Sequence, residues 1–293
     1  MNISDRGYVI NQNQKEYYMK KTLSIAVLAA SIAAMTAISS CKDNSAYDKK
    51  TISFAELTES RTYRLDQSAK DFDTDHDLVF YDSVSLLVPT LIGDNDIRAF
   101  QDTIFKLAFD TTGVDHRAII DKYFETTASD TGYKAIEISA DSVSDRSADG
   151  FEIVCGNVVN LDAKFTVYCI TNQSYGLHAA HGMTVKQYVN YLNDSGKVLT
   201  MSDLFSPQGL KELPELIAKR ANELSTIIGP TDVTALPSTF YISAAGEIMF
   251  VYQPYEIASF AQGIISIPFY PYELVDYMTA ESIDLFNLVD LYD

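Results

Sequence analysis

The chain has 293 residues, with 22 Lys and Arg against 40 Asp and Glu, so its formal net charge is -18 at pH 7. Charged residues make up 21% and hydrophobic residues 47%, a globular composition that excludes a disordered or fibrous chain. The acidic balance argues against nucleic-acid binding and against a polybasic membrane surface, because both need clustered Lys and Arg. It suits a cationic partner instead.

The N-terminus has the pattern of an export signal. Lys20 and Lys21 precede an uncharged apolar run over residues 22–37, and the segment 38–41 (Ile-Ser-Ser-Cys) follows. The apolar run is shorter than the ~20 residues that a spanning helix needs. The last segment resembles the lipobox of bacterial lipoproteins, which implies that residues 1–40, a polar extension and a signal peptide, are removed and that Cys41 carries a lipid. The alternative is an ordinary secretory signal with a chance cysteine.

The next segment, residues 41–50, is polar and is predicted to be a tether. Residues 1–40 contain four basic and two acidic residues, so their removal leaves a net charge of -20. Lys42-Asp43 loosely resembles the surface-export signal of Bacteroidetes lipoproteins. We therefore expect a cell-envelope protein that is held to a membrane by its lipid anchor alone and is periplasmic or surface-exposed.

Residues 51–149 are predicted to form an N-terminal α+β domain. Strand-like runs cover 52–65 and 78–91, and helical spacing of apolar residues appears over 97–108 and 114–124. The acidic segment 71–77 superficially resembles a calcium loop. It lacks the glycine and the closing Glu of that motif, so a solvated loop is the better interpretation. The polar stretch 126–149 favours a domain boundary or a long surface loop.

Two cysteines of the mature chain lie on neighbouring strand-like runs. Cys155 and Cys169 are equidistant from Asp162 in a predicted hairpin, and the export signal places them in an oxidising compartment. A disulfide between them is one possibility. Two buried free thiols are the other, because a register slip of one residue puts the side chains on opposite faces.

The remaining chain, residues 150–293, alternates short strands and helices. Strands are expected over 184–192, 197–200, 240–252 (a hairpin) and 264–269. Ser206-Pro207 predicts the start of a helix that Gly229-Pro230 ends, and a second helix starts at Pro271. Strands and helices in clusters with tight turns favour an α+β fold, mainly antiparallel sheet with packed helices, in two sub-domains.

Several blocks in the C-terminal half resemble one family. They are Ala180-His181-Gly182, the run 191–205, and the segments 240–246, 252–263 and 267–270. In order and spacing they are similar to the extracytoplasmic domain that RsiV, the lysozyme-sensing anti-sigma factor, shares with PdaC-type peptidoglycan deacetylases. That family usually has two glycines where this chain has His178-Ala179. The resemblance implies an RsiV-like domain over 150–293 and makes lysozyme the most concrete partner.

No catalytic motif accompanies these blocks. PdaC-type proteins owe their catalysis to a separate deacetylase domain, and we expect none here, nor the cytoplasmic anti-sigma segment of RsiV. The chain has four histidines. The spacing of His178 and His181 lacks the further ligands of a metal site. We therefore expect no metal, no cofactor and a non-catalytic role, although glycoside hydrolysis is not excluded by so many carboxylates.

The expected function is binding or sensing at the cell envelope. Tyr255 and Glu256 lie at a bend after Pro254 and are the candidate contacts for a cationic protein such as lysozyme. A tyrosine-rich sheet core is the alternative explanation for the many tyrosines of this region. The alternative function is an envelope protein that binds or hydrolyses a glycan such as peptidoglycan.

Overall fold

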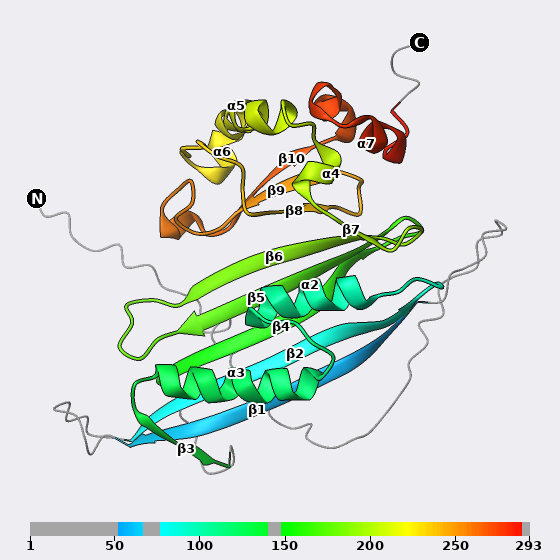
Figure 1. Ribbon diagram of the computed structural model, residues 1–293. Helices are drawn as coiled ribbons and strands as arrows, with labels where there is room; N and C mark the ends of the chain where they lie inside the picture. Colours follow the sequence, from blue (N-terminus) through cyan, green and yellow to red (C-terminus); the bar gives the residue numbers. More distant parts are fainter. Residues whose placement is uncertain (1–51, 67–76, 140–147, 289–293) are drawn as a thin grey trace, which may run out of the picture. The chain divides into compact units, whose positions relative to one another are not determined.

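The computed structural model describes residues 52–66, 77–139 and 148–288 (Figure 1). These residues belong to one compact unit, Asp43–Asp293. The signal peptide, Cys41, the tether and nearly all of the acidic segment 71–77 lie outside the described residues. Within the described part of the chain, no helix is long and apolar enough to cross a membrane.

A seven-stranded sheet forms the larger layer, in the order β3-β1-β2-β4-β5-β6-β7. Neighbouring strands are antiparallel except for β2 and β4, which are parallel. The β2–β4 pairing crosses the predicted boundary at 149/150, so the segments 51–149 and 150–293 share this sheet. The strands are β1 (Ile52–Asp66), β2 (Leu78–Ile92), β3 (Lys134–Ile138), β4 (Gly150–Leu161), β5 (Phe165–Tyr175), β6 (Met183–Leu192) and β7 (Lys197–Leu199).

Two helices, α2 (Arg98–Phe109) and α3 (His116–Asp130), cover one face of this sheet (Figure 1). Strand β2 supplies every second residue to that face, including Val84 and Leu86, because side chains alternate along a strand. Helix α2 contributes Phe100 and Ile104, which are four residues apart and fully buried. The predicted helical spacing over 97–108 is therefore confirmed.

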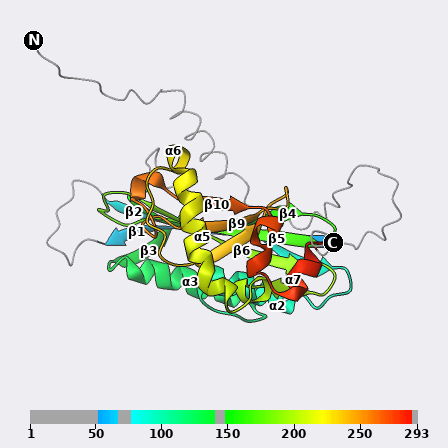
Figure 2. The same cartoon turned by 90° about the horizontal axis from the view of Figure 1, so that it is seen from above.

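A smaller antiparallel sheet has the order β10-β9-β8 and carries α5 (Gly209–Glu223) on top of it (Figure 2). Leu213, Ile217 and Ala221 of α5 are fully buried, and the Ser206 side chain accepts a hydrogen bond from the Gly209 N–H at its start. The other elements here are α4 (Met201–Leu204), α6 (Ser225–Ile228), β8 (Thr239–Ile242), β9 (Ile248–Tyr252), η2 (Phe260–Gln262), β10 (Ile265–Phe269), η3 (Pro271–Tyr277) and α7 (Ala280–Leu285).

A buried asparagine joins the two sheets. The Asn190 side chain on β6 donates to the Phe240 carbonyl and accepts from the Ile242 N–H of β8, each at 2.9 Å, as a neighbouring strand would. On β5, Val167 packs with the small sheet whereas Tyr168 packs with α2, so the small sheet lies on the opposite face of the large one. The expected α+β class with mainly antiparallel sheet is confirmed.

Candidate functional site

Tyr255 lies at the tip of the loop between β9 and η2 in a strained conformation. Its φ is 72°, in the left-handed region that is rare for bulky residues and costs about 1–2 kcal/mol. The Glu256 carboxylate accepts a hydrogen bond from the Gln253 N–H at 2.7 Å, and the Glu256 N–H donates to the Gln253 carbonyl at 3.1 Å. Glu256 thus closes the turn, and the Tyr255 side chain is 57% exposed.

The base of this loop is fixed to the large sheet. The Gln253 side chain accepts from the Lys186 N–H at 2.9 Å and donates to the Lys186 carbonyl at 2.7 Å. The amide therefore satisfies both backbone groups of one β6 residue, as a paired strand would. Because of this contact, the position of Tyr255 depends on β6 as well as on its own turn.

His181 completes a group of three rings at the surface, here called the aromatic cluster (His181, Tyr255 and Phe260), of which Phe260 is half-buried. His181 stacks on Phe260 with ring centroids 3.9 Å apart, and its Nε2 lies 3.2 Å from the Tyr255 hydroxyl. The Tyr255 and Phe260 rings are 5.6 Å apart. The structure thus keeps Tyr255 at the surface, as the sequence predicts, and adds two partners from other segments.

The loop that carries His181 runs between β5 and β6. His178 adopts a φ of 62°, a conformation that glycine takes without strain. This is one of the two positions where the resembling family usually has glycine. The Tyr175 hydroxyl donates to the Ala179 carbonyl at 2.9 Å and so holds the loop across its own turn. His178 therefore adopts the left-handed backbone conformation at the bend of this loop, and the loop brings His181 to Phe260.

The charge distribution is uneven along the sequence. From residue 221 to residue 293 the chain contains no Lys, Arg or His. This stretch includes the whole small sheet and two of the three rings of the aromatic cluster. A cationic partner therefore meets no basic side chain from this stretch. Its ten acidic residues are Glu223, Asp232, Glu247, Glu256, Glu273, Asp276, Glu281, Asp284, Asp290 and Asp293.

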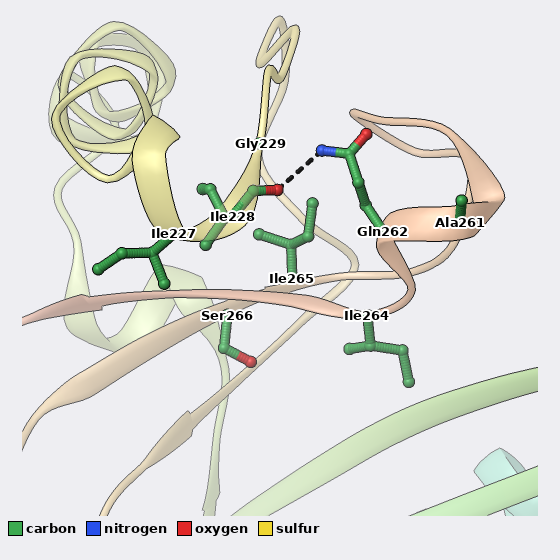
Figure 3. A pocket seen from close by; sticks show the side chains of 8 residues that line it. All are labelled: Ile227, Ile228, Gly229, Ala261, Gln262, Ile264, Ile265 and Ser266. Atoms are coloured by element: carbon green, nitrogen blue, oxygen red, sulfur yellow. Dashed lines mark hydrogen bonds between the residues drawn. The ribbon is translucent and has the colours of Figure 1, made fainter. Parts of the chain in front are cut away.

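A cavity of about 470 Å³ lies at the edge of β10, where residues of α6 and η2 meet the start of the strand (Figure 3). We call it the edge groove. The Gln262 side chain at one end donates to the Ile228 carbonyl at 2.8 Å. Ile227, 81% exposed, lies at the mouth. The lining combines apolar side chains with an equal share of polar surface, and it comprises Ile227, Ile228, Gly229, Ala261, Gln262, Ile264, Ile265 and Ser266.

The two strand cysteines are both free thiols, so the disulfide that the sequence allowed is not made. Cys155 lies opposite Thr171, and Cys169 lies opposite Asn157. The Asp162 carboxylate accepts from the N–H groups two and three residues later, so the hairpin turns after Asp162 rather than around it. The two cysteines are consequently diagonal neighbours, whose Cα atoms lie about 7–8 Å apart. This separation is larger than a disulfide ordinarily spans.

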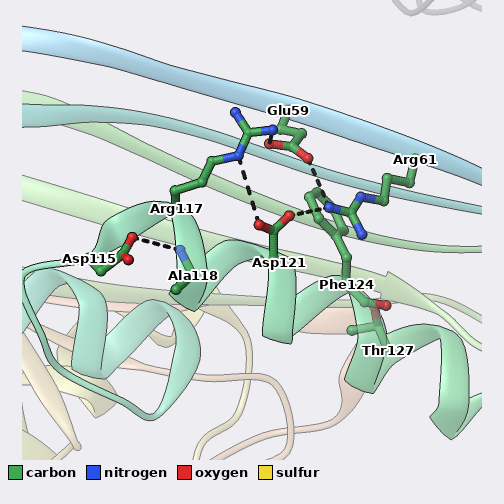
Figure 4. A network of polar contacts seen from close by, with 8 residues as sticks. All are labelled: Glu59, Arg61, Asp115, Arg117, Ala118, Asp121, Phe124 and Thr127. Carbon is green, nitrogen blue, oxygen red and sulfur yellow. Dashed lines mark hydrogen bonds and ion pairs between the residues drawn. The ribbon is translucent and has the colours of Figure 1, made fainter.

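A polar network attaches α3 to the large sheet (Figure 4). The Arg61 guanidinium of β1 lies 4.7 Å over the Phe124 ring and pairs with Asp121 and with Glu59. Arg117 also reaches Glu59, at 3.3 Å. These charges are partly exposed and mutually paired, so they serve to hold the helix and do not form a ligand site.

Beneath α3, one buried carboxyl group is incompletely paired. Asp82 of β2 has no exposed surface, and it accepts a hydrogen bond from the Thr127 hydroxyl through Oδ2. Its Oδ1 and the Tyr123 hydroxyl are buried and interact with each other without a hydrogen bond of ordinary geometry. Burial raises the pKa of Asp82 to about 7. The hydrogen bond from Thr127 opposes this shift, and the neighbouring Glu152 adds to it.

No metal-binding arrangement occurs in residues 52–66, 77–139 and 148–288, where no three His, Cys, Asp or Glu side chains converge. Cys41, the expected lipidation site, lies outside these ranges. The exposed aromatic cluster with the adjoining edge groove is therefore the candidate functional site. An arrangement of this kind can bind a ligand by ring contacts and apolar burial.

The fold and this surface place the chain among α+β proteins with two stacked sheets. Residues 202–272, which run from α4 into η3, match the family described as "Protein of unknown function (DUF3298)". The chain therefore contains a DUF3298 domain. The match includes Tyr255, Phe260 and the edge groove but not His181. The sequence has no match among curated proteins.

Two solved structures share this fold. The crystal structure of a DUF3298 family member from Bacteroides fragilis NCTC 9343 superposes with a TM-score of 0.61 at 16% identity, covering 81% of this chain and 97% of that one. A DUF3298 family protein from Pseudomonas aeruginosa PAO1 gives 0.50 at 13% identity, covering 80% of this chain and 97% of that one. At these identities the likeness shows the fold alone.

Sequence reasoning missed two parts of this surface. Phe260 carries no signal of its own in the sequence, and His181 is indicated there as part of a family-like block and as a metal ligand without partners, not as a neighbour of Tyr255. No local pattern links them, because the rings meet through the contact between Gln253 and β6. The absence of basic residues from 221 to 293 is visible in the sequence, and it is a signal that points to the small sheet.

Proposed function

We propose that this protein is a lipid-anchored binding or sensing protein of the bacterial cell envelope, and that it binds a cationic protein through the aromatic cluster. The observation that carries the proposal is Tyr255, which is held at a φ of 72° with its ring exposed beside His181 and Phe260. Strain of this kind persists only where the surroundings impose it, and it gathers at ligand contacts.

The physical chemistry of the surface favours a protein partner. Aromatic side chains that are already ordered bury large areas at little entropic cost, and they dominate the energetics of protein interfaces. The net charge of -18 would accelerate the encounter with a basic protein and disfavour an acidic one. The aromatic cluster would then keep the dissociation of the complex slow, and the negative charge would make its association fast.

Lysozyme is the proposed partner because of the resemblance to the RsiV and PdaC-type domain. The blocks that carry this resemblance include both His181 and Tyr255. The envelope location rests on the signal-like segment and on the lipobox that ends at Cys41. No catalytic role is proposed for the domain.

A glycan of the envelope is the second candidate ligand. The observation in its favour is the exposed ring of Tyr255 beside His181, since exposed rings also accommodate sugars. Retention of the protein on isolated peptidoglycan at molar salt, without binding to lysozyme, would favour this candidate.

The experiment is a titration of lysozyme with the purified protein and two single variants. Tyr255→Ala should weaken binding at least tenfold, as loss of a central aromatic anchor does. Tyr272→Ala is the matched control, because Tyr272 is equally exposed at 55% and lies outside the cluster. Equal affinities of the two variants would remove the cluster from the binding surface.

A further inference from the structure

We propose that the free edge of β10 accepts an extended segment of the cationic partner as a fourth strand of the small sheet, with one apolar side chain of that segment in the edge groove. This inference rests on the proposed function, because it takes the segment from the same partner. It adds the mode of recognition: main-chain pairing along β10 beside the aromatic cluster.

The first ground is that the small sheet has one covered and one open edge. The β8 edge faces β6 and is bonded to Asn190, as described above. In the described part of the chain, β10 pairs with β9 and with no strand on its other side. An open edge presents unpaired N–H and C=O groups that another chain can use.

Pro268 fixes which groups point outward. Pro268 lies opposite Met249 of β9. Proline has no N–H to donate, so in an edge strand its nitrogen faces the unpaired side. Because the direction of the backbone groups alternates along a strand, Ser266 presents its N–H and C=O to the same open side. Ser266 also lines the edge groove, so these main-chain groups lie beside the cavity.

The second ground is the groove itself. Strand addition gains affinity from main-chain hydrogen bonds and specificity from pockets for alternate side chains. Ile227 at the mouth of the groove is 81% exposed, and Ile264 and Ile265 line it from the two sides of the strand (Figure 3). An apolar side chain of an added strand would cover this exposed isoleucine.

The third ground is charge, which selects the occupant. All of β8, β9, β10 and η2 lie in the stretch without Lys, Arg or His, and the whole chain carries -18. A second copy of the chain would bring the same negative charge to this edge. A segment that alternates apolar residues with Lys or Arg would instead match both the groove and the charge.

The fourth ground is continuity with the proposed binding surface. Phe260 of the aromatic cluster and Ala261 of the groove are consecutive residues of η2. One partner can therefore contact the rings and the strand edge at the same time. The rings alone contact the partner at one point. Pairing along the strand edge would extend this contact and fix the register of the partner segment.

The test uses a capped hexapeptide of alternating valine and arginine and the same peptide with its alternate backbone nitrogens methylated. We expect the first to bind and to slow hydrogen exchange of the Ser266 amide. The methylated peptide, with equal charge, should bind at least tenfold more weakly because it lacks the main-chain donors. Equal affinities, unchanged exchange at Ser266 or no binding of either peptide would overturn the inference.

Two further arms separate this inference from the proposed function. Ile227→Ser should weaken peptide binding at least about fivefold, whereas Val114→Ser should not, although both side chains are 81% exposed. Equal losses would contradict the groove. With lysozyme as the probe, binding without protection of Ser266 overturns strand addition and leaves the proposed function intact. Peptide binding with Ser266 protection, but no lysozyme binding, overturns the lysozyme proposal alone.

Discussion

The Tyr255 hydroxyl lies 3.2 Å from Nε2 of His181, although 74 residues separate the two in the sequence. The contact exists because Gln253 fixes the β9–η2 loop to β6, the strand that follows the His181 loop. The candidate surface is thus built at the junction of the two sheets, and it should be lost if that junction loosens.

The backbone strain at Tyr255 gives a prediction about stability. Tyr255→Gly should have a higher free energy of unfolding than Tyr255→Ala, by about 1 kcal/mol, because only glycine takes a φ of 72° without a steric penalty. Urea denaturation of both variants measures the difference.

The control for that comparison is Tyr272, which lies in the 3-10 helix η3. There the order should reverse, with Tyr272→Gly less stable than Tyr272→Ala, because glycine loses more backbone entropy at an ordinary φ. The same order at both positions would mean that Tyr255 is not strained.

The buried Asp82 predicts an unusual pH dependence. Its folded-state pKa of about 7 is above the ordinary value of 3.8, so the folded state holds a proton that the unfolded state releases between these values. The contribution of this group to stability is therefore full below about pH 4 and is lost as the pH rises to about 7, by up to about 4 kcal/mol.

Asp82→Asn removes that titration. The variant should be more stable than the parent at pH 8 and should lose the advantage at pH 4, as measured by urea denaturation across this range. Other carboxylates change stability with pH in the opposite sense. One is Asp203, because hydrogen bonds with Lys197 and Thr200 lower its pKa. Their contributions are the same in both proteins and cancel in the difference. Parallel stability curves for the two proteins would show that Asp82 is ionised in the fold.

Packing beneath the large sheet depends on one glycine of β4. A Cβ on Gly156 would overlap the Tyr168 hydroxyl and lie 2.7 Å from Leu86 Cδ2. Gly156→Ala should therefore cost about 1–3 kcal/mol of unfolding free energy. Gly176→Ala is the control, since its Cβ would meet only the Ala179 Cβ, at 3.8 Å. Equal stability of the two variants would contradict this packing.

The lipid anchor is tested by Cys41→Ala. This variant should lose lipid labelling and move from the membrane fraction to the soluble fraction of cells. Recovery of both the parent and the variant in the soluble fraction, with no lipid on either protein, would leave an ordinary secretory signal as the explanation.

Much of the fold could be predicted because its signals are local. The strand-like run over 78–91 predicted β2, spacings of three and four predicted α2, and Ser206 with Gly229 bounded the helical segment that contains α5 and α6. The parallel β2–β4 pairing was not predictable, since it joins strands about 70 residues apart with no short-range pattern.

The site was predictable only in part, for the same reason. Pro254 marks the bend that exposes Tyr255, so that residue was found from the sequence. The roles of Gln253 and Phe260 depend on contacts between distant segments. The pairing of the cysteines stayed open in the sequence because two features set their register: the turn that the Asp162 side chain closes, and the register shift between Val158 and Asn160.

The measurement that tests the central claim most directly is the dissociation rate of lysozyme at low and at molar salt, with cytochrome c as an equally basic control. Molar salt shortens the Debye length to ~3 Å and removes diffuse attraction. A specific surface predicts slow dissociation of lysozyme that persists in molar salt, with only the association rate falling, and no such complex with cytochrome c. Equal behaviour of the two proteins, or no binding of lysozyme, would contradict the account.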